Sequence, residues 1–159
     1  MWLPVLIERF TRDRLKALAR LDHPGDVKPA VLFLCDHNAG RTQIAAGWLR
    51  HLAADRVDVF SGGTAPAADT NQAVVESMAA VGIDISTEYP KPWTDEVAQT
   101  VDVIVTMGCG DACPIVRGTQ YLDWDIPSPT GQAPYVLAEI RDDVRTRVEA
   151  LMASLGVTP

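Results

Sequence analysis

A cysteine and an arginine separated by five residues are the side chains in this sequence best placed to do chemistry together. The segment Cys35-Asp-His-Asn-Ala-Gly-Arg41 follows the apolar run Val31–Leu34 and precedes a predicted helix over residues 42–51. A loop between a buried strand and a helix directs its backbone N–H groups and the positive end of the helix dipole at one point. Such a point binds anions and favours the thiolate form of a cysteine, which is the nucleophilic form. The spacing therefore predicts thiolate attack on a tetrahedral oxyanion.

The residues between and beside these two have expected parts in holding the anion. Arg41 carries a planar fork of donors that fits two oxygens of one anion. The hydroxyl of Thr42 can donate a hydrogen bond to the thiolate of Cys35. A cysteine at the end of a strand can also be an ordinary core residue, but the surrounding strand, glycine and helix favour the functional interpretation. We predict an oxyanion-binding set of Asp36, His37, Asn38, Ala39, Gly40, Arg41 and Thr42, with Cys35 as the nucleophile.

Composition limits the class of protein. The 159 residues are 47% hydrophobic and 22% charged, as expected for one soluble globular domain. The formal charge of −7 argues against nucleic acid or an anionic membrane as a partner. Because no apolar run reaches the length of a membrane span and Met1–Arg9 lacks a signal-peptide layout, we expect a cytoplasmic protein. Three cysteines without a secretory signal predict reactive thiols rather than a structural disulfide framework.

The elements that must position these residues alternate between strand and helix patterns. Strands are predicted at 30–34, 57–60, 101–105 and 121–125, and helices at 42–51, 71–81 and 135–155. A first helix over residues 4–21 is predicted from the spacing of Leu6, Phe10, Leu15, Leu18 and Leu21. This alternation indicates an α/β fold with a parallel sheet covered by helices on both faces.

Residues with useful chemistry follow several of these strands. Cys35, Ser61, Cys109 and the pair Asp123 and Asp125 each stand at the carboxyl end of a predicted strand. In parallel sheets ligands bind beyond those ends. The pattern therefore predicts one shared site, independently of the Cys35 motif.

Two further cysteines, Cys109 and Cys113, lie in a glycine-rich loop predicted over residues 107–118. Glycines on both sides of Cys109 free the backbone to bring it toward Cys35, and one helical turn would give Cys109 and Cys113 the Cα separation of roughly 4.4–6.8 Å that a disulfide needs. We interpret the three cysteines as a relay in which Cys35 forms an adduct with the substrate, Cys109 attacks it, and Cys113 closes a disulfide with Cys109. The alternatives are incidental loop thiols or a zinc pair. No metal is expected, because no second Cys/His pair stands at ligand spacing.

With these motifs in place, the chain resembles the low-molecular-weight protein tyrosine phosphatase superfamily, and within it the thiol-linked arsenate reductases. The resemblance spans about residues 30–155, and the His-Asn-Ala-Gly-Arg form of the loop is similar to the actinobacterial type. It implies a three-layer fold with a four-stranded parallel sheet, an N-terminal helix and linker over 1–29, and the family domain over 30–159. The residues that carry it are Cys35–Gln43, Phe60–Thr64, Gly82–Ser86 and Thr106–Pro114.

The resemblance implies reduction of arsenate to arsenite, with phosphate and sulfate as competing anions. By this analogy Cys35 attacks arsenic, Arg41 clamps the oxyanion, Asn38 holds the loop geometry, and Cys109 and Cys113 carry the disulfide outward. No bound cofactor is implied. The electrons would come from an external thiol, either thioredoxin or mycothiol with mycoredoxin, and an internal cysteine pair favours thioredoxin because thioredoxin reduces protein disulfides.

Two departures from the family pattern are visible. Where family members carry Asp-Pro as a general acid, this chain has Ser128-Pro129, so Asp125 and Asp123 are the candidate acids. Arsenate can release oxygen as water protonated from the substrate itself, so the missing acid weighs against a phosphatase more than against a reductase. A phosphatase and an oxyanion-binding or redox-sensing module remain the alternatives. The second departure is the N-terminal helix, whose apolar face must pack on its own sheet or across a homodimer interface, and we favour the homodimer.

Overall fold

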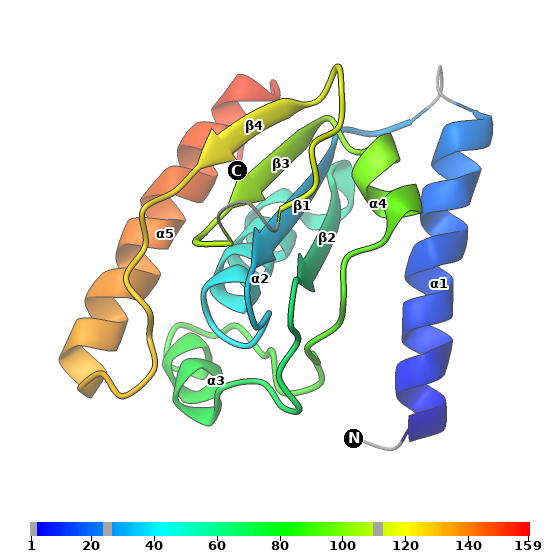
Figure 1. Cartoon of the computed structure of the whole chain (residues 1–159). Coiled ribbons are helices and arrows are strands. Elements are labelled where there is room, and N and C mark those ends of the chain that lie inside the picture. The colour runs from blue at the N-terminus through cyan, green and yellow to red at the C-terminus, as the bar shows by residue number, and fades with distance from the viewer. Residues whose placement is uncertain (1–2, 24–26, 110–112) are drawn as a thin grey trace.

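The sheet at the centre of the molecule places the cysteine loops at one edge. The computed structural model describes residues 3–23, 27–109 and 113–159. Four parallel strands lie in the order β2-β1-β3-β4, with β1 at Ala30–Cys35, β2 at Asp58–Gly63, β3 at Val103–Thr106 and β4 at Gln120–Asp123. Helices α2 (Arg41–Ala53), α3 (Gln72–Ala79) and α5 (Pro134–Ser154) cover one face, and α1 (Leu3–Asp22) and α4 (Asp95–Thr100) cover the other (Figure 1).

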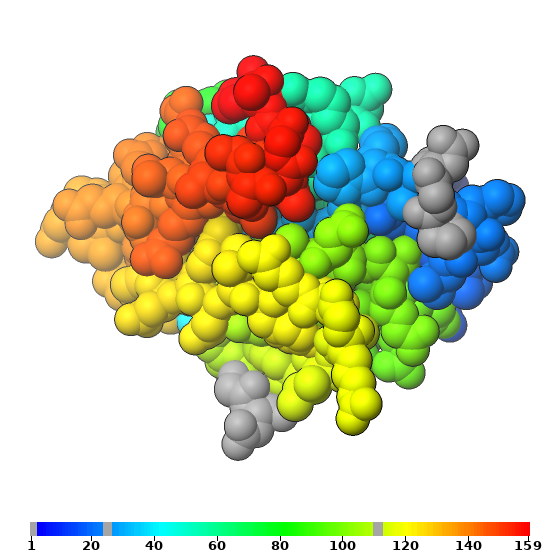
Figure 2. All heavy atoms as spheres, turned by 90° about the horizontal axis from the view of Figure 1, so that it is seen from above, coloured from blue at the N-terminus to red at the C-terminus, as the bar shows by residue number. Residues whose placement is uncertain are grey.

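The predicted three-layer α/β fold with an additional N-terminal helix is thus confirmed. Seen from above, α5 and α1 lie on opposite sides of the molecule (Figure 2). A short 3₁₀ helix, Ala54–Arg56, follows α2. Within the described part of the chain, no helix has both the length and the apolar composition needed to cross a bilayer.

Strand β1 forms the core because its two sides face different layers. Val31, Phe33 and Cys35 pack toward α2 and α5, while Leu32 and Leu34 pack toward α1 and α4. A strand covered on both faces gives the continuous apolar run that the sequence shows. In the register of the sheet Cys35 pairs with Gly63 on one side, and Leu34 pairs with Thr106 on the other. The loops that follow β1, β2 and β3 therefore emerge side by side.

The structure changes the predicted boundary of the third strand. Residues 101–105 were expected to form it, but β3 begins at Val103 and the preceding helix α4 was not predicted. The side chain of Thr94 caps this helix by accepting a hydrogen bond from the N–H of Val97 at 3.4 Å. Helix α4 lies against α1 and provides Val97 and Ala98 to the second core cluster.

Helix α1 packs differently from the expected apolar face. Its buried residues are Ala17 and Arg20, whereas Leu15, Leu18 and Leu21 are 60%, 43% and 38% exposed. A small residue at position 17 allows close approach to α4, and this contact decides which side of the helix faces inward. The leucine stripe therefore points to solvent.

A buried ion pair fixes α1 to the end of β2. Arg20 Nη1 lies 2.9 Å from Asp58 Oδ2, and both side chains are about 5% exposed. Arg20 also donates to the carbonyl of Lys28 at 2.7 Å, and Lys16 Nζ lies 2.8 Å from Asp58 Oδ1. Burial alone would raise the pKa of Asp58, but hydrogen bonds and charge from Lys16, Arg20 and Lys28 outweigh it and hold that pKa below its ordinary 3.8.

Replacing Arg20 with methionine is expected to lower the free energy of unfolding by about 3 kcal/mol, because it leaves the buried Asp58 carboxylate with only the half-exposed Lys16 and Lys28 as partners. The stabilisation from Asp58 is present above the unfolded pKa and is lost as pH falls through the lower folded value, so the difference from wild type should shrink below about pH 4. Urea unfolding at pH 7 and pH 3.5 measures both effects. Arg12→Met, which removes an exposed pair with Glu8, is the control and should change stability by less than about 0.5 kcal/mol. Equal losses in the two variants would contradict the expectation.

Candidate active site

The loop from Cys35 to Gly40 is held from outside by the segment Thr64–Asn71. Four N–H groups of that segment donate to loop carbonyls: Thr64 to Cys35 at 3.2 Å, Ala65 to Asp36 at 2.8 Å, Ala67 to His37 at 2.9 Å and Asn71 to Ala39 at 2.9 Å. By contrast, the N–H groups of Asp36, His37, Ala39 and Gly40 find no acceptor among the described residues. Amides left unpaired at the start of a helix are a ready anion site.

Asn38 is the residue that fixes the shape of this loop. It is fully buried and has φ = +51°, a left-handed conformation that Asn adopts more readily than most residues. Its side-chain Nδ2 donates to Thr42 Oγ1 at 2.8 Å, its Oδ1 accepts from the N–H of Lys91 at 3.0 Å, and its carbonyl accepts from Gln43 Nε2 at 2.8 Å. These bonds hold a conformation that the isolated backbone would disfavour.

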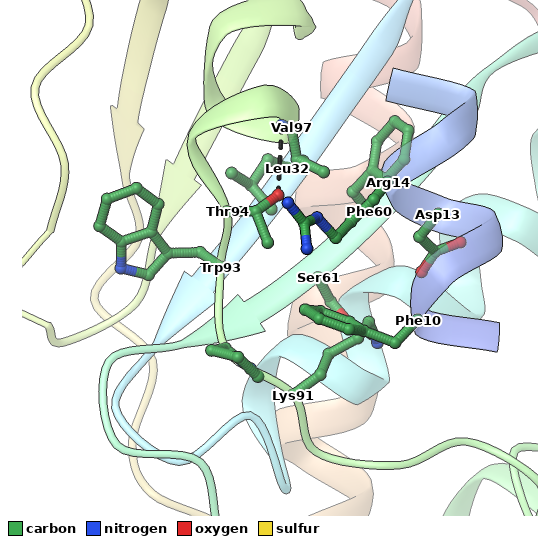
Figure 3. Close-up of a pocket in the computed structure, with 11 residues that line it drawn as sticks. Phe10, Asp13, Arg14, Leu32, Phe60, Ser61, Lys91, Trp93, Thr94 and Val97 are labelled. Carbon is green, nitrogen blue, oxygen red and sulfur yellow. Dashed lines mark hydrogen bonds between the residues drawn. The ribbon is translucent and has the colours of Figure 1, made fainter. Parts of the chain in front are cut away.

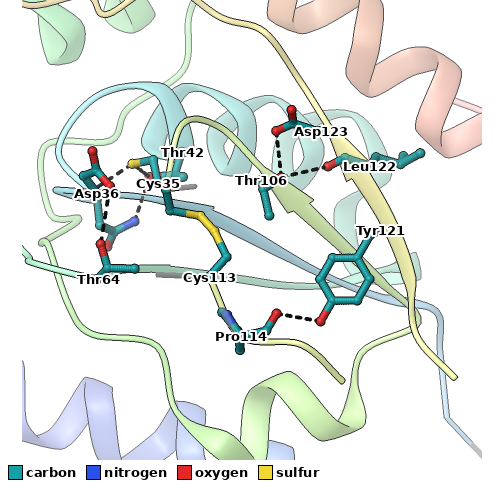
Figure 4. Close-up of a disulfide and its surroundings, with 12 residues drawn as sticks. Cys35, Asp36, Thr42, Thr64, Thr106, Cys113, Pro114, Tyr121, Leu122 and Asp123 are labelled. Carbon is teal, nitrogen blue, oxygen red and sulfur yellow. Dashed lines mark hydrogen bonds between the residues drawn. A yellow bond between two sulfur atoms is a disulfide. The ribbon is translucent and has the colours of Figure 1, made fainter. Parts of the chain in front are cut away.

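Cys35 lies at the bottom of the loop with its sulfur in a donor-rich position. It is 2% exposed, and Sγ accepts from the N–H of Asn38 at 3.2 Å and lies 3.4 Å from Thr42 Oγ1 (Figure 4). Because Asn38 Nδ2 already donates to the Thr42 oxygen, the hydroxyl hydrogen of Thr42 is free to point at Cys35. Two donors therefore face this one sulfur atom.

Arg41 faces a cleft next to the loop that carries the other two cysteines. The cleft has a volume of about 660 Å³ and is lined by Arg41, Thr106, Gly108, Asp123, Trp124, Asp125 and Ile126. Arg41 Nη1 donates to the carbonyl of Ile126 at 3.4 Å. Gly108 has φ = +90°, and a Cβ added to it would lie 2.9 Å from Arg41 Nη1. Glycine is thus required where the loop after β3 passes over the guanidinium.

Cys109 and Cys113 form a disulfide in this loop, with their Cα atoms 5.5 Å apart, and Cys35 is a free thiol (Figure 4). Cys109 is 6% exposed, whereas Cys113 is half-buried. The helical turn predicted between them falls on residues 110–112, which lie outside the described residues. The structure therefore brings Gly108 to Arg41, while Cys109 lies in the core cluster on the α1 and α4 side of the sheet and Cys113 packs against that cluster.

The candidate acids line the same cleft as Arg41. Asp123 and Asp125 are both exposed, and Thr106 Oγ1 donates to Asp123 Oδ1 at 2.8 Å. Pro129 lies directly against the oxyanion loop, since a Cβ at Gly40 would be 2.6 Å from Pro129 Cγ. Ser128, its neighbour, is exposed, and its hydroxyl oxygen accepts from the N–H of Thr130 at 3.3 Å. The Ser-Pro pair thus stands beside the anion loop without a carboxylate.

Other predicted residues have different surroundings. His37 is exposed and contributes its carbonyl to the outer hydrogen bonds, while Asp36 is half-buried with Oδ1 3.4 Å from the hydroxyl of Thr64. Ser61, expected at the common edge, faces Lys91 instead. Neither Lys91 nor the outer segment 64–71 could be found from the sequence, because both reach the loop through main-chain hydrogen bonds and Lys91 is buried only by the fold. In the described part of the chain no three His, Cys, Asp or Glu side chains are grouped as metal ligands would be.

Comparisons with known proteins show relatives over most of the chain. A glutaredoxin arsenate reductase from Synechocystis is 34% identical over 129 residues, which cover 79% of this chain and 98% of that protein. Arsenate reductase 2 from Staphylococcus epidermidis is 32% identical over 127 residues, covering 77% of this chain and 95% of that protein. The solved structure of a thioredoxin-dependent arsenate reductase from Corynebacterium glutamicum is 41% identical, with a TM-score of 0.86 over 97% of this chain and 75% of that one.

Most of the chain also matches one described protein family. Residues 30–158 match the low molecular weight phosphotyrosine protein phosphatases. The match covers the sheet, the oxyanion loop and the loop that carries Cys109 and Cys113, and it begins where α1 and its linker end. The resemblance expected from the motifs is confirmed. The chain belongs to the low molecular weight phosphotyrosine protein phosphatase family.

Proposed function

We propose that this protein is an arsenate reductase that uses Cys35 as its nucleophile and Cys109 and Cys113 as an internal redox relay. The observation that carries the proposal is the Cys109–Cys113 disulfide, which begins one residue after Gly108, the residue in contact with Arg41. A phosphatase needs only the nucleophile, the anion loop and an acid. Two more cysteines in the loop that passes over Arg41 are explained by a reaction that consumes thiols. The arsenate reductase relatives support the same conclusion.

The proposed reaction balances with three thiols. The Cys35 thiolate attacks the As(V) centre held by the loop amides and Arg41, and one oxygen leaves as water. The Cys109 thiolate then attacks Cys35 Sγ, the sulfur–arsenic bond breaks, and its electron pair stays on arsenic, which departs as As(III) arsenite. Finally the Cys113 thiolate attacks Cys109 Sγ and releases Cys35 as a thiolate. The structure with Cys35 free and the other two joined corresponds to the end of this sequence.

Protons for the departing oxygen have two sources in this proposal. One is arsenate itself, whose own hydroxyl group can supply a proton. The other is Asp123 or Asp125, which share the wall of the cleft with Arg41. Asp125 is the better placed of the two to remain available, because Asp123 accepts a hydrogen bond from Thr106.

We propose thioredoxin as the external reductant. A protein dithiol must reach one sulfur of the disulfide, and Cys113 is the more exposed of the pair. The relative from Corynebacterium glutamicum is described as thioredoxin-dependent, which supports this choice over mycothiol with mycoredoxin. A disulfide that must be reduced in every cycle requires a compartment supplied with reducing equivalents, so we place the protein in the cytoplasm.

Arsenate-dependent consumption of NADPH tests the function and the donor together. The purified protein is assayed in parallel with thioredoxin plus its reductase and with mycothiol plus mycoredoxin. Continuous turnover in the thioredoxin arm alone is the expected result. Turnover only with mycothiol would show that mycothiol is the electron donor, and the proposed arsenate reductase activity would still hold. Sulfate binding without turnover in either arm would indicate an oxyanion-binding module, and hydrolysis of aryl phosphates without arsenate reduction would indicate a phosphatase.

We also propose that residues 1–29 are an addition to the family domain at 30–159 and that α1 forms a homodimer interface. The support is an exposed apolar stripe on this helix, formed by Leu3, Ile7, Leu15, Leu18 and Leu21. A stripe of this size on a surface helix is typical of an interface. Sedimentation of the wild type and of Leu15→Glu/Leu18→Glu tests it. A monomeric wild type, or a double variant that remains a dimer, would contradict the proposal.

A further inference from the structure

Behind the oxyanion loop lies a buried lysine that the proposed chemistry does not use. Lys91 is 5% exposed, and its Nζ donates to Ser61 Oγ at 3.1 Å and lies 4.8 Å from the centre of the Tyr89 ring. None of the ion pairs among the described residues includes it. Burying an ammonium group without a carboxylate partner costs stability. A residue kept at such a cost points to a function in the site.

The main chain of the same residue holds the oxyanion loop directly. The N–H of Lys91 donates to Asn38 Oδ1 at 3.0 Å, and its carbonyl accepts from the N–H of Gly63 at 2.9 Å. Asn38 is the strained residue of the loop, and Gly63 pairs with Cys35 in the sheet. We propose that Lys91 is a positioning residue for the oxyanion loop, in which the ammonium bonded to Ser61 anchors the main chain that holds Asn38.

Helix α1 provides the cover that buries this ammonium group. Phe10 and Asp13 of α1 line one small cavity together with Phe60 and Ser61 of β2 and Lys91, and Phe10 and Ser61 lie next to Lys91 (Figure 3). The space left between them is about 10 Å³, room for about one water molecule. Because α1 precedes the part of the chain that matches the family, the burial of Lys91 depends on an element outside that match. The side chain of Lys91 therefore connects α1 to the anion loop.

The charged side chains near Lys91 come from three parts of the chain. Together with Lys91 they line a hollow of about 230 Å³ next to the small cavity. The pKa of Lys91 is lowered to about 8, mainly by burial and also by the charge of Arg50, while Glu88 and Asp13 act in the opposite direction. Burial is also the main cause that raises the pKa of Asp13 and raises the pKa of Tyr89 to about 12. The titratable groups lining the hollow are Arg9, Arg12, Asp13 and Lys16 from α1, Arg50 from α2, and Glu88 and Tyr89 from the segment that precedes Lys91.

This arrangement gives opposite pH trends for stability and for anion binding. The folded pKa of Lys91, about 8, is lower than its ordinary 10.5, so the unfolded chain binds more protons between these values and stability rises with pH there. Over the same range the ammonium becomes neutral and its hydrogen bond to Ser61 weakens, so the loop should bind anions less tightly. If Lys91 had only a structural role, stability and anion binding would not change in opposite directions with pH.

Sulfate protection of Cys35 against iodoacetamide tests the proposal, because sulfate keeps its charge across this pH range. With the disulfide closed Cys35 is the free thiol, so alkylation reports the loop alone. In Lys91→Met the sulfate concentration for half-protection at pH 7 should rise roughly tenfold, as for the loss of one charge-assisted hydrogen bond. The urea midpoint should stay the same or rise, because a buried charge has been removed. The matched control Arg147→Met removes a surface charge of α5 that pairs with Asp143, outside the groups that line the hollow, and should change neither value.

The wild type and Phe10→Ala provide a second test that does not depend on how Lys91→Met folds. Sulfate protection in the wild type should weaken above about pH 8, and this decline should be absent in Lys91→Met. Phe10→Ala opens the cover and admits water, so the decline should move toward pH 10.5. Unchanged protection in Lys91→Met, or an unmoved decline in Phe10→Ala, would overturn the proposal. Although the inference rests on the oxyanion loop of the proposed reductase, sulfate binding tests Lys91 whether or not arsenate is reduced.

Discussion

Cys113→Ser is expected to stop repeated arsenate reduction while still producing one arsenite per protein molecule. Cys35 and Cys109 suffice to reduce one arsenate, after which they remain joined as a disulfide. Cys35 is 2% exposed and Cys109 6%, so a protein reductant has little access to either sulfur. Cys113 is half-buried and is the sulfur through which the disulfide can be reached. Turnover in the thioredoxin assay should fall at least about 100-fold, since reduction of the trapped disulfide requires local opening of the site.

The measurement is a count of arsenite released per reduced protein, with and without thioredoxin. Cys109→Ser is the matched control, because it removes the same kind of group from the same loop but blocks the first release of arsenite. We expect about one arsenite from Cys113→Ser, none from Cys109→Ser, and many from the wild type with thioredoxin. Sustained turnover in Cys113→Ser would show that Cys35–Cys109 is reduced directly and that the relay stops one cysteine earlier.

Ser128→Asp is expected to raise hydrolysis of phenyl phosphate about 100-fold, the lower part of the range for general-acid assistance. Phenolate is a poor leaving group unless it is protonated, and the wild type offers an exposed hydroxyl beside the oxyanion loop at this position. Pro129 lies against Gly40, so a carboxyl at residue 128 would stand at the rim of the site. Because the acid works only when protonated, the gain should decrease as pH rises.

Two comparisons test whether this gain comes from acid catalysis. p-Nitrophenyl phosphate has a leaving group that needs little protonation, and its hydrolysis should rise only a few-fold. Thr130→Asp adds the same charge two residues away, on an exposed side chain, and should leave both substrates unchanged. A uniform rise for both substrates, or a rise in Thr130→Asp, would attribute the effect to charge rather than to acid catalysis.

The anion loop could be predicted from the sequence because its signals are close together in the chain. Val31–Leu34 is apolar on both sides of a strand, and Cys35 and Arg41 follow within one loop and one helix start. Helix α1 was also predictable from its spacing, but its orientation was not. Ala17 and Arg20 face inward because a small residue permits contact with α4 and a charged one finds Asp58. Leucines were therefore a poor guide to the inner face.

The parts that could not be predicted depend on contacts between distant segments. Lys91 has the sequence context of an exposed lysine. It is buried because α1, with Phe10 and Asp13, packs beside it in the fold. Helix α4 is six residues long, too short to show a hydrophobic period, although Thr94 before two acidic residues is a helix-start signal. The outer segment 64–71 holds the loop mainly through backbone hydrogen bonds, which its residue types do not reveal.

The four hydrogen bonds that hold the carbonyls of the Cys35 loop have a consequence for selectivity in the cell. A cradle whose shape is set by the protein offers the same amides to any tetrahedral dianion, so phosphate and arsenate should compete for it on nearly equal terms. Discrimination must then come after binding, from the reducibility of the central atom. A thiol can take arsenic from As(V) to As(III) but has no equivalent route for phosphorus. Phosphate would therefore delay the enzyme without diverting its electrons, and the rate of detoxification would follow the ratio of the two anions rather than the concentration of arsenate alone.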